Sequence, residues 1–145
     1  MTALLDVNRL TIRTRTTTLV RDLSFQIAPG ERVGLIGESG SGKSLTALAA
    51  TGLLPAGLAA QGSVELAGRQ VIGTPDRQLD RLRGTAAAIV FQEPLTALDP
   101  LMRVGRQVAE PLARRARRDG RSLSGTVLEE AVLALLDEVA LPDPA

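Results

Sequence analysis

The chain has 145 residues, which is long enough for one domain with a hydrophobic core, and its net charge of +1 argues against a field that would attract nucleic acid or an anionic membrane. It contains no Cys and no His, which excludes disulfides, thiolate metal sites, histidine bases and the common zinc sites. The N-terminus has no basic segment followed by an apolar run, and no apolar stretch approaches the ~20 residues of a membrane span, so we expect any membrane role to come through a partner.

Two stretches with alternating apolar residues open the chain. Residues 4–13 and 19–28 each place apolar side chains at many alternate positions, which is typical of half-buried strands. The threonine-rich residues 14–18 between them indicate a turn, and Pro29 and Gly30 mark the next turn. The sequence therefore predicts an antiparallel hairpin.

A glycine-rich motif follows the hairpin. It fits the pattern G-x-x-x-x-G-K-[ST] and consists of Gly37, Glu38, Ser39, Gly40, Ser41, Gly42, Lys43 and Ser44. Residues 32–36 before it indicate a short buried strand, and residues from 43 to about 54 indicate a helix that Pro55 and Gly57 stop. Strand, glycine loop and helix in this order are typical of a loop that points backbone N–H groups at phosphate oxygens. We therefore expect a bound nucleoside triphosphate, with Lys43 at the β- and γ-phosphates and Ser44 on Mg²⁺.

Lys43 is the only lysine in a chain that holds 17 lysines and arginines together. A lysine at this one position indicates a need for a compact ammonium on a flexible stem, in place of the planar guanidinium that the chain uses elsewhere. The alternative is a turn rich in Gly and Ser that happens to end in Lys-Ser. The strand and helix expected on either side favour the phosphate site.

The middle of the chain alternates short strands with one short helix. Residues 62–68 indicate a strand between glycines, and residues 75–83 indicate a surface helix that carries Leu79 and Leu82. Residues 86–91 form an apolar run of strand length that ends abruptly at Gln92. We therefore expect residues 1–93 to form a β-rich part.

Beyond residue 93 the pattern is helical. Asp99 and Pro100 indicate the start of a helix in which Pro111 predicts a kink or a break. Thr126 and Glu129 fit a capping box that opens a second helix with one apolar face. Residues 94–145 are therefore expected to form a partial α-helical subdomain.

The motif at residues 37–44 and the run Phe-Gln-Glu-Pro-Leu-Thr-Ala-Leu-Asp-Pro at residues 91–100 resemble the nucleotide-binding subunits of ABC transporters. The variant resembles the oligopeptide, dipeptide and nickel permease branch or the related glutathione importers, and the resemblance covers nearly the whole chain. It implies an α/β fold of the P-loop NTPase type with an ABC-type nucleotide-binding domain. It also implies ATP and Mg²⁺ as ligands, with Gln92 as the residue whose amide oxygen binds Mg²⁺ and senses the γ-phosphate.

The resemblance further implies the role of the parent protein. Such a subunit couples ATP hydrolysis to the uptake of peptides or similar small solutes. It works with transmembrane permease subunits and with a second ATP-binding subunit, identical or different, at the cytoplasmic face of the cell membrane. No nucleic-acid partner is expected. The sequence does not give the transported solute, because the permease and its binding protein usually set it.

Three elements of the family pattern are not matched: the Leu-Ser-Gly-Gly-Gln signature, the Walker B strand that ends in Asp-Glu, and the switch histidine. Residues 123–125 begin like the signature but continue Thr-Val, and residues 132–138 end in Asp-Glu but have a helical period. Residues 13–16 also lack the aromatic that the family often stacks on adenine. We therefore expect the N-terminal part of a longer protein, truncated within the helical subdomain, which binds nucleotide weakly and hydrolyses none.

Several alternatives stay open from the sequence alone. A soluble ABC ATPase acting in repair or translation would carry a coiled-coil or charged insertion after Gln92, and a P-loop kinase or GTPase would carry base-reading motifs; neither feature is seen. The fragment could also be a non-enzymatic binding piece. The apolar residues 95–102 either dock a transmembrane subunit or fill the core of the helical part. The arginines of residues 114–121 form either a solvated helix end or a contact with a membrane-embedded partner.

Overall fold

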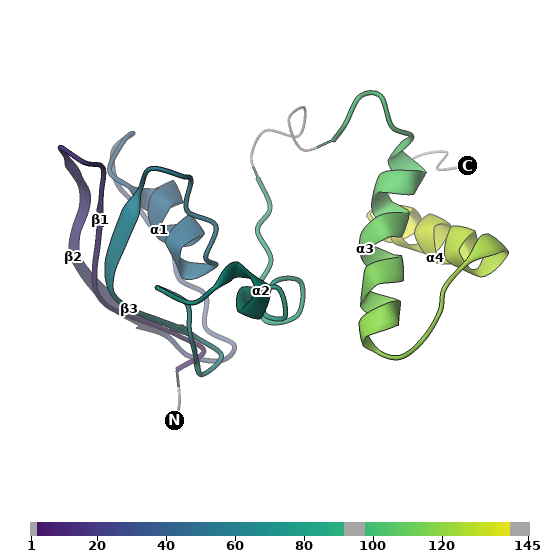
Figure 1. The fold of residues 1–145 in the computed structure, drawn as a ribbon, viewed down its shortest axis with the longest axis horizontal. Coiled ribbons are helices and arrows are strands. Elements are labelled where there is room, and N and C mark those ends of the chain that lie inside the picture. The colour runs from purple at the N-terminus through teal and green to yellow at the C-terminus, as the bar shows by residue number, and fades with distance from the viewer. Residues whose placement is uncertain (1–2, 92–97, 140–145) are drawn as a thin grey trace. The chain divides into compact units, whose positions relative to one another are not determined.

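The computed structural model describes residues 3–91 and 98–139. The chain divides into two compact units, Met1–Ile89 and Val90–Ala145, and each is described by itself (Figure 1). The boundary expected between residues 93 and 94 lies in the segment 92–97, outside the described residues.

The first unit is built on an antiparallel sheet with the strand order β2-β1-β3-β4. Its strands are β1 (Leu5–Arg13), β2 (Thr18–Ile27), β3 (Ala59–Leu66) and β4 (Arg69–Gln70). β1 lies in the middle and pairs with both β2 and β3, so that Val7 stands opposite Phe25 on one side and Val64 on the other. The predicted hairpin of residues 4–28 is confirmed.

One face of β1 forms the core, although its buried residues do not alternate strictly. Val7, Leu10 and Ile12 are almost fully buried, with a spacing of three residues and then two. A bulge resets the register between Val7 and Leu10, where Arg9 adopts a positive φ of 51°. The extra residue turns Leu10 back to the face on which the helix α1 (Lys43–Ala50) packs (Figure 1).

Helix α1 begins where the sequence predicts and ends about four residues earlier. Its end has the hydrogen bonds of a Schellman motif: the Gly52 N–H donates to the Ala49 carbonyl, and the Leu53 N–H donates to the Leu48 carbonyl. Gly52 has a φ of +69°, which L side chains rarely adopt. The helix is therefore stopped by Gly52, and the expectation that Pro55 and Gly57 stop it is wrong.

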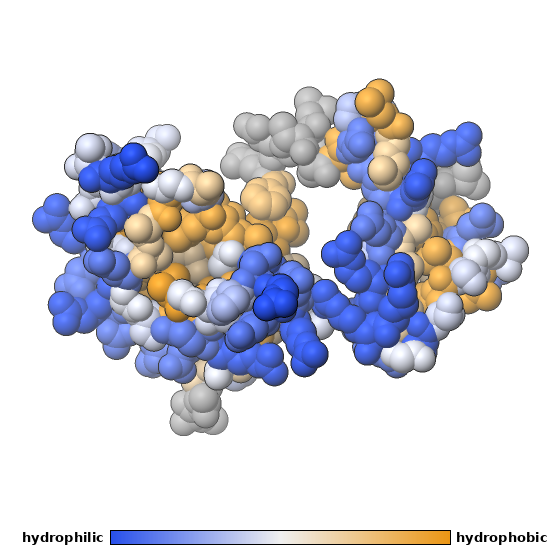
Figure 2. Space-filling view, in the orientation of Figure 1, coloured by the Kyte–Doolittle hydropathy of each residue, from blue (hydrophilic) through white to orange (hydrophobic). Residues whose placement is uncertain are grey.

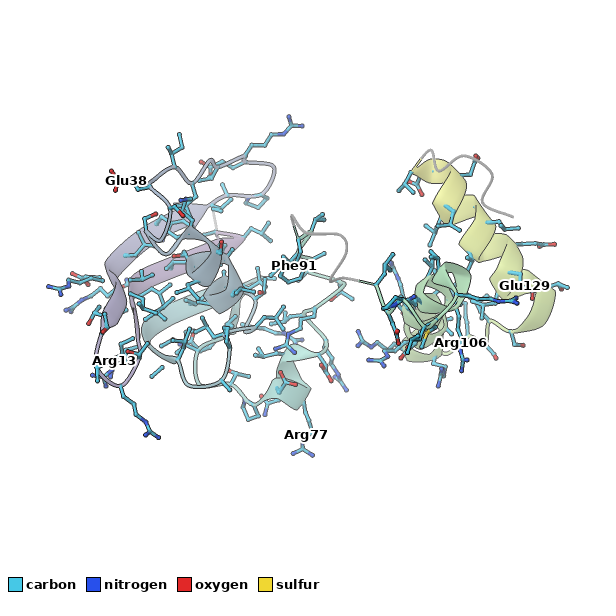
Figure 3. The ribbon with its side chains drawn as sticks, turned by 90° about the horizontal axis from the view of Figure 1, so that it is seen from above. Arg13, Glu38, Arg77, Phe91, Arg106 and Glu129 are labelled. Carbon is cyan, nitrogen blue, oxygen red and sulfur yellow. The ribbon has the colours of Figure 1, made fainter. Side chains whose placement is uncertain are left out.

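Helix α2 (Asp76–Leu79) is a single turn within the predicted range 75–83. Its last residue Leu79 is 4% exposed, and Leu82 in the following turn is 7% exposed. These two leucines pack into the core below α1, while Arg77 on the same turn points into solvent (Figure 3). The short helix and the turn after it therefore bury two leucines, of which Leu79 lies against Gly52 at the C-terminal end of α1.

The two apolar runs expected as strands at residues 32–36 and 86–91 are not strands. Val33 is 49% exposed and Ile36 is 96% exposed, and the later run forms only one isolated bridge, between Arg83 and Ala87. A strand needs a neighbour for its backbone N–H and C=O groups. In the described parts of the chain, the four strands pair with one another and none lies beside either run. The apolar composition of these two runs was therefore not enough to predict a strand.

Within its described residues, the second unit contains the helices α3 (Val104–Arg118) and α4 (Gly125–Glu138), and the buried residues are Ala116 on α3 and Val132 and Leu136 on α4. The face of α3 that Figure 2 shows is mostly hydrophilic. α3 continues through Pro111, so the predicted break does not occur there. Residues 132–138 lie inside α4, which confirms the prediction that this Asp-Glu run is helical. Ser124 occupies the N-cap position of α4, so the capping box assigned to Thr126 and Glu129 is wrong.

α3 begins at Val104 and not at Pro100, because Asp99 organises a turn of its own. The Asp99 carboxylate accepts from the Leu101 N–H at 2.9 Å, and the Asp99 carbonyl accepts from the Met102 N–H at 3.1 Å. The side-chain amide of Gln107 then bonds both the N–H and the C=O of Asp99. A side chain that satisfies its own turn is not available as the cap of the next helix.

The packing of α1 against α2 predicts that Gly52→Ala strongly lowers the free energy of unfolding. A Cβ at Gly52 would lie 2.5 Å from Cδ1 of Leu79 and 3.3 Å from Cγ1 of Val71, both of which are buried. We expect the free energy of unfolding to fall by about 3 kcal/mol, from left-handed strain plus overpacking. The matched control is Gly57→Ala, which has the same sign of φ and open space around it, and should lose only about 1 kcal/mol. Urea unfolding measures the loss of stability in both variants, and equal losses would contradict the close packing of Leu79 and Val71 against Gly52.

Candidate phosphate-binding site

The glycine motif forms a tight loop against the start of β2. The Ser41 N–H donates to the Glu38 carbonyl at 3.2 Å, and Gly42, the N-cap of α1, has a φ of +89°. A Cβ on Gly42 would lie 2.5 Å from Cγ2 of Val20 and 3.3 Å from the Leu19 carbonyl oxygen. Gly42 is therefore needed both for its backbone conformation and for its close approach to β2.

The Lys43 side chain folds back into this loop. Its Nζ donates to the carbonyl oxygens of Gly37 and Glu38, each at 2.7 Å, and lies 3.4 Å from Oγ of Ser41. All three ammonium donors therefore have a partner within the motif. The result is one positive charge held by the carbonyl groups of a glycine loop, at the N-terminal end of a helix.

The remaining motif residues face solvent. Glu38 and Ser39 are exposed, and the Glu38 carboxylate points away from the loop (Figure 3). Ser44 is exposed in the first turn of α1, next to Lys43 in the chain. The structure thus brings Gly37, Glu38, Ser41 and Lys43 together, while Gln92 lies outside the described residues.

Two supporting residues were missed by the sequence reasoning. Thr46 is 3% exposed, and its Oγ1 donates to the Gly42 carbonyl at 3.0 Å, while its N–H donates to the same oxygen at 2.8 Å. Arg83 caps the opposite end of α1 by donating to the carbonyls of Thr51 and Gly52. A polar residue three positions after Lys43, on the inward face of the helix, was the available signal for Thr46. Nothing local marked the contact of Arg83 with α1, because the carbonyl partners there are 31 and 32 residues away.

Residues 13–16, the segment without an aromatic residue that could stack on a nucleotide base, lie at a hydrogen-bonded turn. Oγ1 of Thr14 accepts from the N–H groups of Thr16 and Thr17, which closes the loop between β1 and β2. Arg13 and Arg15 are exposed on either side of Thr14. This arrangement agrees with solvated arginines at a strand end.

A sequence model of the ABC transporter family matches residues 20–143. This chain belongs to the ABC transporter family. The match confirms the predicted class, an α/β ABC-type domain of the P-loop NTPase fold.

Curated relatives narrow the branch within the ABC transporter family. The chain is 40% identical to the oligopeptide transport ATP-binding protein OppD of Mycobacterium tuberculosis, over 99% of this chain and 24% of that protein. It is 39% identical to OppD of Escherichia coli, over 97% of this chain and 42% of that protein. It is 32% identical to the dipeptide transport ATP-binding protein DppD of Lactococcus lactis, over 86% and 35% of the two chains. The chain thus spans 24% to 42% of the length of these relatives, and the predicted resemblance to this branch is confirmed.

In residues 3–91 and 98–139, no helix is both long enough and apolar enough to cross a membrane.

The buried hydroxyl of Thr46 gives a direct test of how the loop is held. Thr46→Val keeps the shape of the side chain but removes the bond to the Gly42 carbonyl, so we expect the free energy of unfolding to fall by about 1–2 kcal/mol. Thr18→Val, at an exposed threonine of β2, should change it by no more than about 0.5 kcal/mol. Thermal or urea unfolding measures the stability of both variants. An unchanged stability in Thr46→Val would show that the bond from Thr46 to the Gly42 carbonyl does not stabilise the loop.

Proposed function

We propose that this chain is the ATP-binding part of an ABC importer subunit that takes up peptides or similar small solutes. The observation that carries the proposal is the Lys43 ammonium, held 2.7 Å from two carbonyl oxygens inside the glycine loop. Family membership and the printed names of the relatives, which are peptide transport ATP-binding proteins, support the solute class.

The residues of the loop fit a triphosphate. A phosphate oxygen is a stronger partner for an ammonium than a neutral carbonyl, so the Lys43 Nζ can exchange the Gly37 and Glu38 carbonyls for the β- and γ-phosphates. Other backbone N–H groups of residues 37–44 would supply further donors, while that of Ser41 is bonded to the Glu38 carbonyl. The Ser44 hydroxyl would ligate Mg²⁺, and Gln92 would add its amide oxygen. The bound Mg²⁺ would neutralise charge on the phosphates.

Hydrolysis is expected to need groups that the described residues do not provide. Within residues 3–91 and 98–139, no carboxylate forms an ion pair with Lys43, and the Glu38 side chain points into solvent. Orienting an attacking water requires a polar group near the γ-phosphate. We therefore propose that the 145-residue chain binds ATP and does not turn it over.

The partners would be transmembrane permease subunits and a second ATP-binding subunit, which would hold the protein at the cytoplasmic face of the membrane. Leu101 is 95% exposed and Leu98 is 46% exposed, in the turn that precedes α3. Exposed leucines in this turn favour docking over use as the core of their own unit. They also favour a transporter over a soluble ABC ATPase.

ATP binding tests the proposal through Lys43→Ala. The variant loses the charge-assisted contacts to phosphate, so we expect its affinity for MgATP to be weaker by about 10- to 150-fold. Arg69→Ala is the matched control, because it also removes one cation from the first unit, at an exposed position of β4. It should stay within about twofold of the parent chain. Titration calorimetry of all three chains decides the question, and equal affinities of Lys43→Ala and the parent would refute the site.

A coupled ATPase assay tests the second half of the proposal. The parent chain should release phosphate from MgATP no faster than Lys43→Ala does, because the sequence matches neither the Walker B strand nor the switch histidine of the family. Turnover by the parent above the Lys43→Ala background would show that the catalytic groups are present.

A further inference from the structure

Among the described residues, the Arg83 side chain contacts more polar groups than any other side chain. It is 22% exposed, in a turn that follows α2. Its Nε donates to the Thr51 carbonyl at 3.2 Å, and its Nη2 donates to the Gly52 carbonyl at 2.7 Å. Its Nη1 lies 2.7 Å from a carboxylate oxygen of Asp76 and 3.7 Å from one of Asp80. One guanidinium thus joins the C-terminal end of α1 to α2.

These contacts place a cation at the negative end of the helix that carries Lys43 at its other end. α1 is only eight residues long, about 12 Å from end to end. Leu79 packs so closely at Gly52 that a Cβ there would be 2.5 Å from its Cδ1. A shift of α1 is therefore opposed both by the apolar contact with Leu79 of α2 and by the Arg83 fork.

The turn after Arg83 is ordered by its own hydrogen bonds. The N–H groups of Ala86 and Ala87 donate to the Leu82 carbonyl, and the Gly84 N–H donates to the Ala87 carbonyl. Arg83 therefore lies inside the hydrogen-bonded turn of residues 82–87. The contact between Arg83 and α1 ties this turn to the phosphate-binding helix.

We propose that Arg83 is a positioning residue that transmits the placement of α1 to residues 82–87 when a triphosphate binds the glycine loop. This inference rests on the proposed nucleotide site. A planar fork with two carbonyls on one side and two carboxylates on the other holds both elements at fixed orientation, which an ammonium or an apolar side chain of the same length does not do.

Hydrogen exchange measured by mass spectrometry tests the inference on the whole 145-residue chain, with and without MgATP. In the parent chain, MgATP should slow exchange in both residues 37–44 and residues 82–87. In Arg83→Met, at saturating MgATP, the slowing at residues 37–44 should persist and the slowing at residues 82–87 should be lost. The affinity should weaken only about twofold to fivefold, the effect of removing a cation from a helix C-terminus.

Two further variants separate positioning from stability. Arg81→Met removes an exposed arginine from the neighbouring turn and should keep both responses. Asp76→Asn keeps the hydrogen bonds of Arg83 to the α1 carbonyls but weakens its ion pair with α2. The slowing of exchange by MgATP at residues 82–87 should therefore become smaller. This variant replaces Arg83→Met in the test if Arg83→Met does not fold. A purely structural Arg83 would speed exchange equally with and without MgATP.

The outcomes distinguish the two proposals. A full MgATP response at residues 82–87 in Arg83→Met, or no response there in a parent chain that is protected at residues 37–44, would overturn the positioning role alone. No response to MgATP at residues 37–44 in the parent chain would overturn the nucleotide site and, with it, this inference.

Discussion

The contact between the Lys43 ammonium and the carbonyls of Gly37 and Glu38 is the interaction on which the site depends. It keeps a positive charge at the mouth of the loop in a side chain that is otherwise flexible. The contact exists only because the loop closes tightly at Gly42, whose backbone approaches Val20 more closely than any Cβ would allow. The strand β2 therefore shapes the loop even though none of its residues belongs to the motif.

Helix α1 connects this loop to the rest of the first unit. Its N-terminal end carries Lys43, Thr46 anchors its first turn, and Ala49 packs into the core against the sheet. Its C-terminal end is stopped at Gly52 and held by Arg83. A short helix that is fixed at both ends has little freedom to reorient by itself, and on this basis we propose that a change at the phosphate end reaches its surroundings.

The sequence predicted the parts of this structure that depend on local patterns. Alternation gave the hairpin, the glycine motif gave the start of α1, and a 3.6-residue period identified the Asp-Glu run of residues 132–138 as helix. It failed at residues 32–36 and 86–91, because a strand is defined by a neighbour that an apolar run does not reveal. It also missed Thr46 and the contact of Arg83 with α1, since the partners in both contacts are carbonyl groups, and every residue has a carbonyl.

Lys43 is the only lysine of the chain, so its ammonium can be observed by itself. Nuclear magnetic resonance of the chain labelled with ¹⁵N-lysine should show a single Nζ signal at low temperature. The account predicts that MgATP shifts this signal as the ammonium leaves the Gly37 and Glu38 carbonyls for phosphate, and that adenosine, which has no phosphate, leaves it in place. A signal that does not move with MgATP, or that moves equally with adenosine, would contradict the assignment of Lys43 to the phosphates.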